Sequence, residues 1–85
     1  MSEKMKEMME FPVLYTFKAM GENCGTFISG IKDIFCGKNV EHIAEKPSSK
    51  GNYVSVSVTV EVESFSELEH FYTSIKNTKG LKYHL

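Results

Sequence analysis

The segment from residue 46 to residue 53 has the densest group of side chains that could bind a ligand. It contains, in order, Lys46, Pro47, Ser48, Ser49, Lys50, Gly51, Asn52 and Tyr53. Lysine ammonium groups, serine hydroxyls and the free backbone N–H groups of a tight turn could together cradle an anion. The same composition is typical of a solvated turn that only reverses the chain, and the sequence leaves both interpretations open.

A second candidate ligand site precedes the first predicted helix, in the segment Gly21-Glu22-Asn23-Cys24. The N-terminus of a helix favours anions because its unpaired N–H groups and its dipole both point out of the helix. Gly21 is expected to end the preceding strand, and Asn23 is expected to be the N-cap. The adjacent Glu22 would repel an anion. Gly21 and Asn23 are the two residues of this loop that we include in the candidate site.

Several other chemistries lack the residues they need. All ten basic residues are lysine and the net charge is −1, whereas nucleic-acid binders use arginine and a basic patch. Acylphosphatase-type enzymes hold phosphate with an arginine. Metal chaperones need two close cysteines in the first loop, where only Cys24 occurs, and RNA-recognition domains need more stacking aromatics than Tyr53. The scattered histidines and the single aspartate, Asp33, form no Ser-His-Asp triad. We therefore expect no catalytic residue, metal, cofactor or nucleic acid.

The cysteines and the hydropathy indicate a cellular compartment. Cys24 and Cys36 are twelve residues apart, which is about 18 Å along a helix, whereas a disulfide requires Cα atoms within about 7 Å. Both are expected to be free thiols. No apolar run approaches the roughly 20 residues that cross a bilayer, and the first ten residues lack the apolar segment of a secretory signal. These features predict a cytoplasmic protein with no membrane partner.

The elements that must position these residues follow from hydrophobic periodicity. Alternating apolar residues predict strands over residues 11–20 and 53–62, and weaker strands over 40–46 and 81–85. Apolar residues at helical spacing predict one helix between Gly25 and Gly37. A second helix is expected from Ser64, which opens a capping box with Glu67, to Lys79.

The order β-α-β-β-α-β predicts a ferredoxin-like two-layer sandwich. Right-handed crossovers place both helices on one face of a four-stranded antiparallel sheet, with the first and third strands in its centre. Residues 1–10 are expected to form a flexible or short helical arm, and residues 11–85 a single domain. The sheet face opposite the helices could dock a partner. It would present Leu14, Thr16, Lys18, Ser55, Ser57 and Thr59.

Three stretches carry a family resemblance. They are Met9-Glu10-Phe11-Pro12, the run YTFKAMG from residue 15, and residues 46–57, which include the eight-residue run KPSSKGNY. Together they closely resemble the bacterial YbeD family over nearly the whole chain. The resemblance implies a ferredoxin-like fold similar to ACT regulatory domains, which bind small effectors such as amino acids at domain interfaces. It implies no established activity. Because ACT-like domains usually pair through their sheets or helices, it also leads us to expect a homodimer.

We therefore expect a small cytoplasmic regulatory or ligand-sensing module rather than an enzyme. It would bind a small anionic metabolite near residues 46–53 or at Gly21 and Asn23, and act through dimer or partner contacts. The alternative is a protein-interaction adaptor that binds no small ligand. The adaptor would dock its partner on the open sheet face or along an edge strand.

Overall fold

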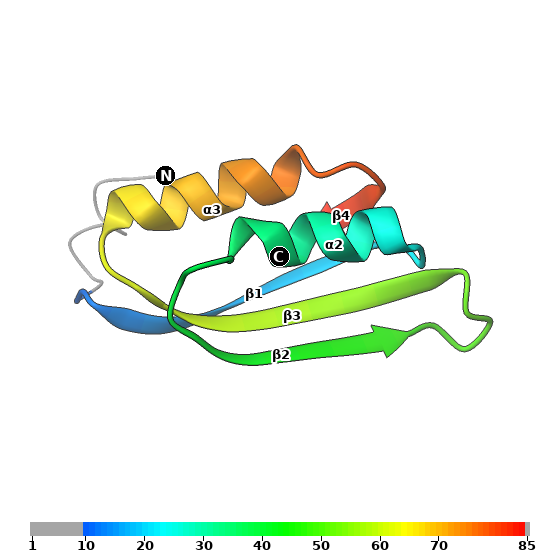
Figure 1. Cartoon of the computed structure of the whole chain (residues 1–85), viewed down its shortest axis with the longest axis horizontal. Helices are drawn as coiled ribbons and strands as arrows, with labels where there is room; N and C mark the ends of the chain where they lie inside the picture. Colours follow the sequence, from blue (N-terminus) through cyan, green and yellow to red (C-terminus); the bar gives the residue numbers. More distant parts are fainter. Residues whose placement is uncertain (1–9, 85) are drawn as a thin grey trace.

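The computed structural model describes residues 10–84 as two layers (Figure 1). A four-stranded antiparallel sheet forms one layer, and two helices cover one of its faces. The elements in chain order are β1 (Val13–Glu22), α2 (Gly25–Ile34), β2 (Val40–Pro47), β3 (Tyr53–Val62), α3 (Phe65–Lys76) and β4 (Leu81–His84). The predicted ferredoxin-like fold is confirmed. The predicted arm, residues 1–10, lies outside the described residues except for Glu10.

The strand order is β2-β3-β1-β4, so the first and third strands lie in the centre as predicted. β1 pairs with β3 along its whole length, from Val13 opposite Val62 to Glu22 opposite Tyr53. The prediction that Gly21 ends the first strand is wrong. The strand continues to Glu22 because the Glu22 N–H donates a hydrogen bond of 3.0 Å to the carbonyl of Gly80.

The core lies between the sheet and the helices, and β3 supplies much of it. Alternation along a strand sends every second side chain to one face. The β3 residues that face the helices, each at most 2% exposed, are Val54, Val56, Val58, Val60 and Val62. The rings of Phe17, Phe35 and Phe71 pack in the same core with centroids 4.7 to 5.5 Å apart. Full burial of one such side chain stabilises the fold by about 1.5–3 kcal/mol, so this layer dominates stability.

The second helix begins as predicted. The Ser64 hydroxyl oxygen accepts a hydrogen bond of 3.2 Å from the Glu67 N–H. The Glu67 carboxylate in turn accepts one of 2.9 Å from the N–H of Glu63, one residue before the cap. This reciprocal arrangement is a variant of the capping box. It satisfies the Glu67 N–H, one of the groups that a helix start would otherwise leave unpaired, and the N–H of Glu63 just before the cap.

The first helix begins at Gly25 as predicted, but its N-cap and its end differ from the prediction. Its N-cap is Cys24, with no side-chain cap, so the assignment of Asn23 as N-cap is wrong. The Asn23 side chain instead donates a hydrogen bond of 3.0 Å to the carbonyl of Gly51. The helix also ends at Ile34, before Gly37, because the N–H groups of the next residues turn back to carbonyls only three residues earlier.

Candidate ligand-binding site

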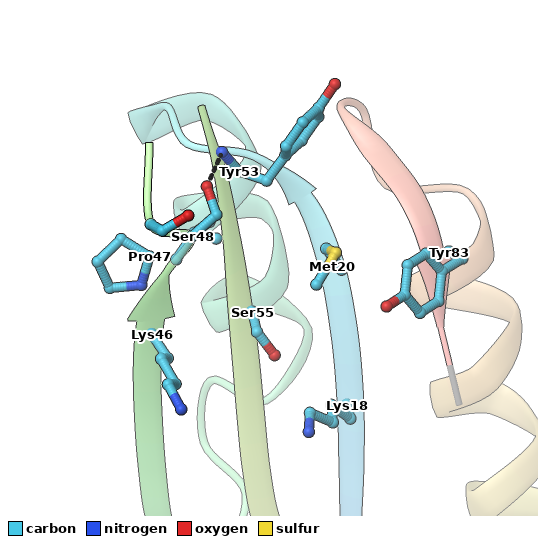
Figure 2. A pocket seen from close by; sticks show the side chains of 10 residues that line it. Lys18, Met20, Lys46, Pro47, Ser48, Tyr53, Ser55 and Tyr83 are labelled. Atoms are coloured by element: carbon cyan, nitrogen blue, oxygen red, sulfur yellow. Dashed lines mark hydrogen bonds between the residues drawn. The ribbon is translucent and has the colours of Figure 1, made fainter. Parts of the chain in front are cut away.

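The sheet face opposite the helices carries a hollow of about 350 Å³ at the end where β2 and β3 join (Figure 2). We call it the open-face pocket. Its lining residues are Lys18, Met20, Lys46, Pro47, Ser48, Ser49, Tyr53, Val54, Ser55 and Tyr83. Small-molecule pockets usually have volumes of about 300–1,000 Å³, so this one suits a compact ligand.

Strand pairing brings the central pocket residues into one row. Met20 of β1 lies opposite Ser55 of β3 on one side and opposite Tyr83 of β4 on the other. Lys46 of β2 lies on the far side of Ser55. Directly opposite residues of an antiparallel pair point to the same face. All four side chains therefore project from the open face, with Tyr83 and Lys46 at its two edges (Figure 2).

The pocket is positively charged. Among residues 10–84, Lys18 and Lys46 are the charged residues of its lining, and none of the carboxylates lines it. Within residues 10–84 the salt bridges of the protein join Lys32 to Glu45 and Lys38 to Glu67, and neither involves a pocket lysine. The chain as a whole has a net charge of −1. Two lysines without acidic partners therefore make this part of the surface attractive to anions.

One side of the pocket is rich in apolar and aromatic surface. Tyr83 is 53% exposed and Tyr53 is 43% exposed, although large aromatic rings usually gain from burial. Between these two residues lies the half-buried Met20, whose thioether packs well against aromatic rings (Figure 2). Pro47 adds further apolar surface at the hairpin. The pocket thus combines cationic groups with exposed rings.

The hairpin between β2 and β3 is held by its own hydrogen bonds. The Ser48 N–H donates to the Tyr53 carbonyl at 2.8 Å, and the Tyr53 N–H donates to the Ser48 hydroxyl oxygen at 3.2 Å (Figure 2). The Gly51 N–H donates to the Ser48 carbonyl at 2.9 Å. The expectation of free backbone N–H groups is therefore wrong for these three residues, because the turn closes on itself. An anion beside Ser48, Gly51 or Tyr53 would rely on side chains rather than on these N–H groups.

The two predicted ligand segments touch each other, but only one reaches the pocket. Ser48, Ser49 and Tyr53 line it together with Lys46, whereas the residues at the hairpin tip, 50–52, are exposed outside it. Neither Gly21 nor Asn23 lines the pocket. Gly21 is buried, and a Cβ placed on it would lie 2.5 Å from the Gly80 carbonyl oxygen.

The comparisons with known proteins identify the family. Residues 6–85 match the family model described as "Protein of unknown function (DUF493)". The chain belongs to this family. A UPF0250 protein of Haemophilus influenzae (strain PittEE) is 36% identical over 83 residues, covering 93% of this chain and 88% of its own. A UPF0250 protein of Buchnera aphidicola is 34% identical over 76 residues, covering 87% and 86%. The resemblance to the YbeD family is confirmed.

Solved structures show that the DUF493 chain has an ACT-like fold. Protein HP0495 from H. pylori superposes with a TM-score of 0.78 at 18% identity, covering 92% of this chain and 86% of its own. The ACT domain from GTP pyrophosphokinase of Chlorobium tepidum gives 0.69 at 14% identity, covering 85% and 96%. At these identities the likeness concerns the fold alone.

The predicted partner face of this DUF493 protein is a continuous surface that overlaps the pocket. Thr16 and Thr59 lie opposite each other and their hydroxyls are hydrogen-bonded at 2.8 Å. Lys18 lies opposite Ser57. Of the predicted face residues, Lys18 and Ser55 line the open-face pocket, and the rest continue the face beyond it.

Sequence reasoning missed three pocket residues, Met20, Val54 and Tyr83. Met20 continues the outward-facing row of Leu14, Thr16 and Lys18 in β1, and this period of two was the signal that could have included it. Tyr83 is separated from Met20 by more than 60 residues, and only the pairing of β4 with β1 brings them together. Their contribution is the apolar part of the pocket.

Three further expectations concern the cysteines, membrane crossing and metal binding. Cys24 and Cys36 are free thiols, as predicted, and both are exposed. Neither α2 nor α3 is long and apolar enough to cross a bilayer. No group of three His, Cys, Asp or Glu side chains that could hold a metal occurs within residues 10–84.

Proposed function

We propose that this protein is a small cytoplasmic regulatory module, not an enzyme, that binds an anionic metabolite in the open-face pocket. The observation that carries the proposal is the pair Lys18 and Lys46, which line a hollow to which the described part of the chain contributes no carboxylate. The ACT-like fold supports a regulatory role, since one structural neighbour is an ACT domain from a GTP pyrophosphokinase. Free, exposed cysteines suit a reducing compartment.

The lysines set the strength of binding. Two opposite charges 4 Å apart attract by about 1 kcal/mol in water and by about 4 kcal/mol at an effective dielectric constant of about 20. The pocket is open to solvent, so each lysine should contribute near the lower value, about 1 kcal/mol or a factor of about five in affinity. Such a site binds reversibly, as a sensor must.

The hairpin offers a route for the signal. The Asn23 N–H donates to the Asn52 carbonyl at 3.1 Å, and the Asn23 side chain donates to the Gly51 carbonyl. A ligand that shifts Ser48 or Tyr53 would therefore also pull on the loop before α2. Binding on the open face would then change the helix-covered side, where a partner could detect it.

A titration followed by amide NMR tests the proposal. Pyrophosphate is a suitable first probe because it is a small, strongly charged anion. Saturable shifts at Ser48, Tyr53 and Ser55 are expected, with Lys46→Gln weakening the affinity by about fivefold. Lys50→Gln is the matched control, because Lys50 lies on the same hairpin outside the pocket. Equal losses for both variants would indicate non-specific attraction and would contradict the proposal.

The exposed face beyond the pocket favours a second candidate, a protein-interaction adaptor. Leu14 is 56% exposed on this face, beside the hydrogen-bonded pair Thr16 and Thr59. An adaptor would lose its partner in a Ser57→Glu variant with an unchanged melting temperature, because a partly exposed strand position tolerates the substitution. Partner capture that survives this variant would exclude docking on the open face.

A further inference from the structure

We infer that the ligand of the open-face pocket is a compact amphipathic organic acid, with one anionic head and one aromatic or branched apolar body. The inference rests on the proposed function and narrows it from anions in general to this class. Its basis is the division of the pocket into a cationic part and an apolar part, which lie at different places on the same sheet face.

The cationic part surrounds Ser55. Lys46 of β2 and Lys18 of β1 extend on either side of this β3 residue, and the Ser55 hydroxyl lies between their ammonium groups (Figure 2). Neighbouring strands are about 4.8 Å apart, so β1 and β2 are separated by about 10 Å across β3. Long lysine side chains span such a distance easily. An anionic head above Ser55 would thus meet two cations and one hydroxyl donor.

The apolar part lies towards the hairpin and the β4 edge. It consists of Met20, Tyr53 and Tyr83, with Met20 beside Tyr83 and the Tyr53 ring nearer the hairpin (Figure 2). Tyr83 and Lys46 are at opposite edges of the four-stranded sheet, about 14 Å apart at the usual strand spacing. A bare inorganic anion held over Ser55 leaves this part uncovered, whereas an organic body attached to the head would cover it.

The size and charge of the pocket restrict the class further. A volume of about 350 Å³ lies near the lower end of the usual range for small-molecule sites, which favours a ligand with one ring over a dinucleotide. The described residues give the pocket cationic side chains but no carboxylate to pair with an ammonium group. An organic acid without an amino group therefore fits better than an amino acid.

Four probes of related structure separate the two parts of the ligand. They are 3-phenylpropionate, which has head and body, acetate, which has the head alone, the neutral 3-phenylpropanamide, which has the body alone, and pyrophosphate. In amide NMR titrations of the full chain, 3-phenylpropionate should bind about tenfold more tightly than acetate or the amide, since it uses both parts of the pocket. Shifts should centre on Met20, Tyr53 and Ser55.

Two variants assign the parts. Tyr83→Ser should weaken 3-phenylpropionate several-fold and leave pyrophosphate unchanged, whereas Lys46→Gln should weaken both. Lys82→Ser is the control for Tyr83→Ser, because Lys82 is the neighbouring exposed residue of β4 and does not line the pocket. A melting curve for each variant shows that it is folded, which is expected because Lys46 and Tyr83 are exposed.

The outcomes separate the inference from the proposed function. If acetate and pyrophosphate bind as tightly as 3-phenylpropionate and all depend on Lys46, the anion site stands and the amphipathic class is wrong. If the neutral amide binds as tightly as the acid and Lys46→Gln has no effect, the site is apolar and both claims fail. If no probe shifts the pocket residues at millimolar concentration, both claims are also overturned.

Discussion

A single added methyl group at Gly21 should destabilise the whole domain. Gly21 lies inside β1, and a Cβ built on it would be 2.5 Å from the Gly80 carbonyl oxygen and 2.6 Å from a ring carbon of Phe27. Phe27 is fully buried, so its ring has little room to move. The Gly80 carbonyl also accepts the hydrogen bond from Glu22, so a shift of Gly80 would weaken that bond.

The loss of stability in Gly21→Ala is the difference between two opposing free-energy contributions. Overpacking a core usually destabilises the folded state by about 1–3 kcal/mol. Replacing glycine also restricts the unfolded chain, which stabilises the protein by about 0.4–1 kcal/mol. The backbone of Gly21 is not in the left-handed region, so alanine adds no conformational strain. The net loss for Gly21→Ala should be about 1–2 kcal/mol, or about 5–15 °C in the melting temperature of a domain of this size.

Thermal unfolding followed by circular dichroism measures the effect, and Gly25→Ala is the matched control. Gly25 is the first residue of α2, and nothing lies within 4 Å of the Cβ that alanine would add there. This control should raise the melting temperature by a few degrees, since only the unfolded-state term remains. If Gly21→Ala were as stable as Gly25→Ala, the steric argument would be refuted and Gly21 would again be free for a ligand role.

Three further predictions concern α3. Ser64→Ala removes the cap of the Glu67 N–H and should cost about 1 kcal/mol, lowering the melting temperature by about 4–8 °C. The hydrogen bond from the Glu63 N–H holds the pKa of Glu67 below 4.5. The stabilisation by the Glu67 carboxylate is therefore complete above pH 4.5 and is lost as the pH falls. The melting temperature of Glu67→Gln should therefore fall less in acid than that of the wild type. Burial raises the pKa of Tyr72 above its ordinary 10.0. The folded state then keeps a proton that the unfolded state releases, so stability should fall as the pH rises above 10.0, and less so in Tyr72→Phe.

Each of these predictions has a clear contrary result. An unchanged melting temperature in Ser64→Ala would mean that the cap is dispensable, and Ser66→Ala on the exposed face of α3 should show what a neutral change looks like. If the melting temperatures of the wild type and Glu67→Gln fell equally in acid, the Glu67 carboxylate would not have the stabilising role assigned to it. If the wild type and Tyr72→Phe lost stability equally as the pH rises above 10.0, the alkaline loss would not come from the Tyr72 phenol.

The fold was predictable because its signals are local. The valines of β3 alternate without a break, and Ser64 with Glu67 marks the start of α3 within a few residues of sequence. Handedness of the crossovers then fixes the layers. The ends of α2 were not predictable in the same way. Asn23 has the chemistry of an N-cap, but its side chain instead donates a hydrogen bond to the Gly51 carbonyl, 28 residues away.

The pocket was predictable only in part, because it depends on register between distant strands. Lys46, Ser48 and Tyr53 could be grouped since they share one hairpin. Met20 and Tyr83 meet through the pairing of β1 with β4, and no periodicity within either segment specifies that register. The closed hydrogen bonds of the turn likewise appear only in three dimensions, which is why the expected backbone cradle was wrong for part of it.

The alternation along β3 also has an evolutionary consequence. Buried valines such as Val56 and Val58 hold the fold, whereas Ser55 and Ser57 between them face outwards and bear little of its stability. The proposed ligand binding and the folding of the domain thus depend on alternating residues of the same ten-residue strand. Selection can change one set while the other stays fixed, so relatives could diverge in ligand preference on a constant scaffold. A mutant library confined to the outward positions would vary specificity at nearly constant stability.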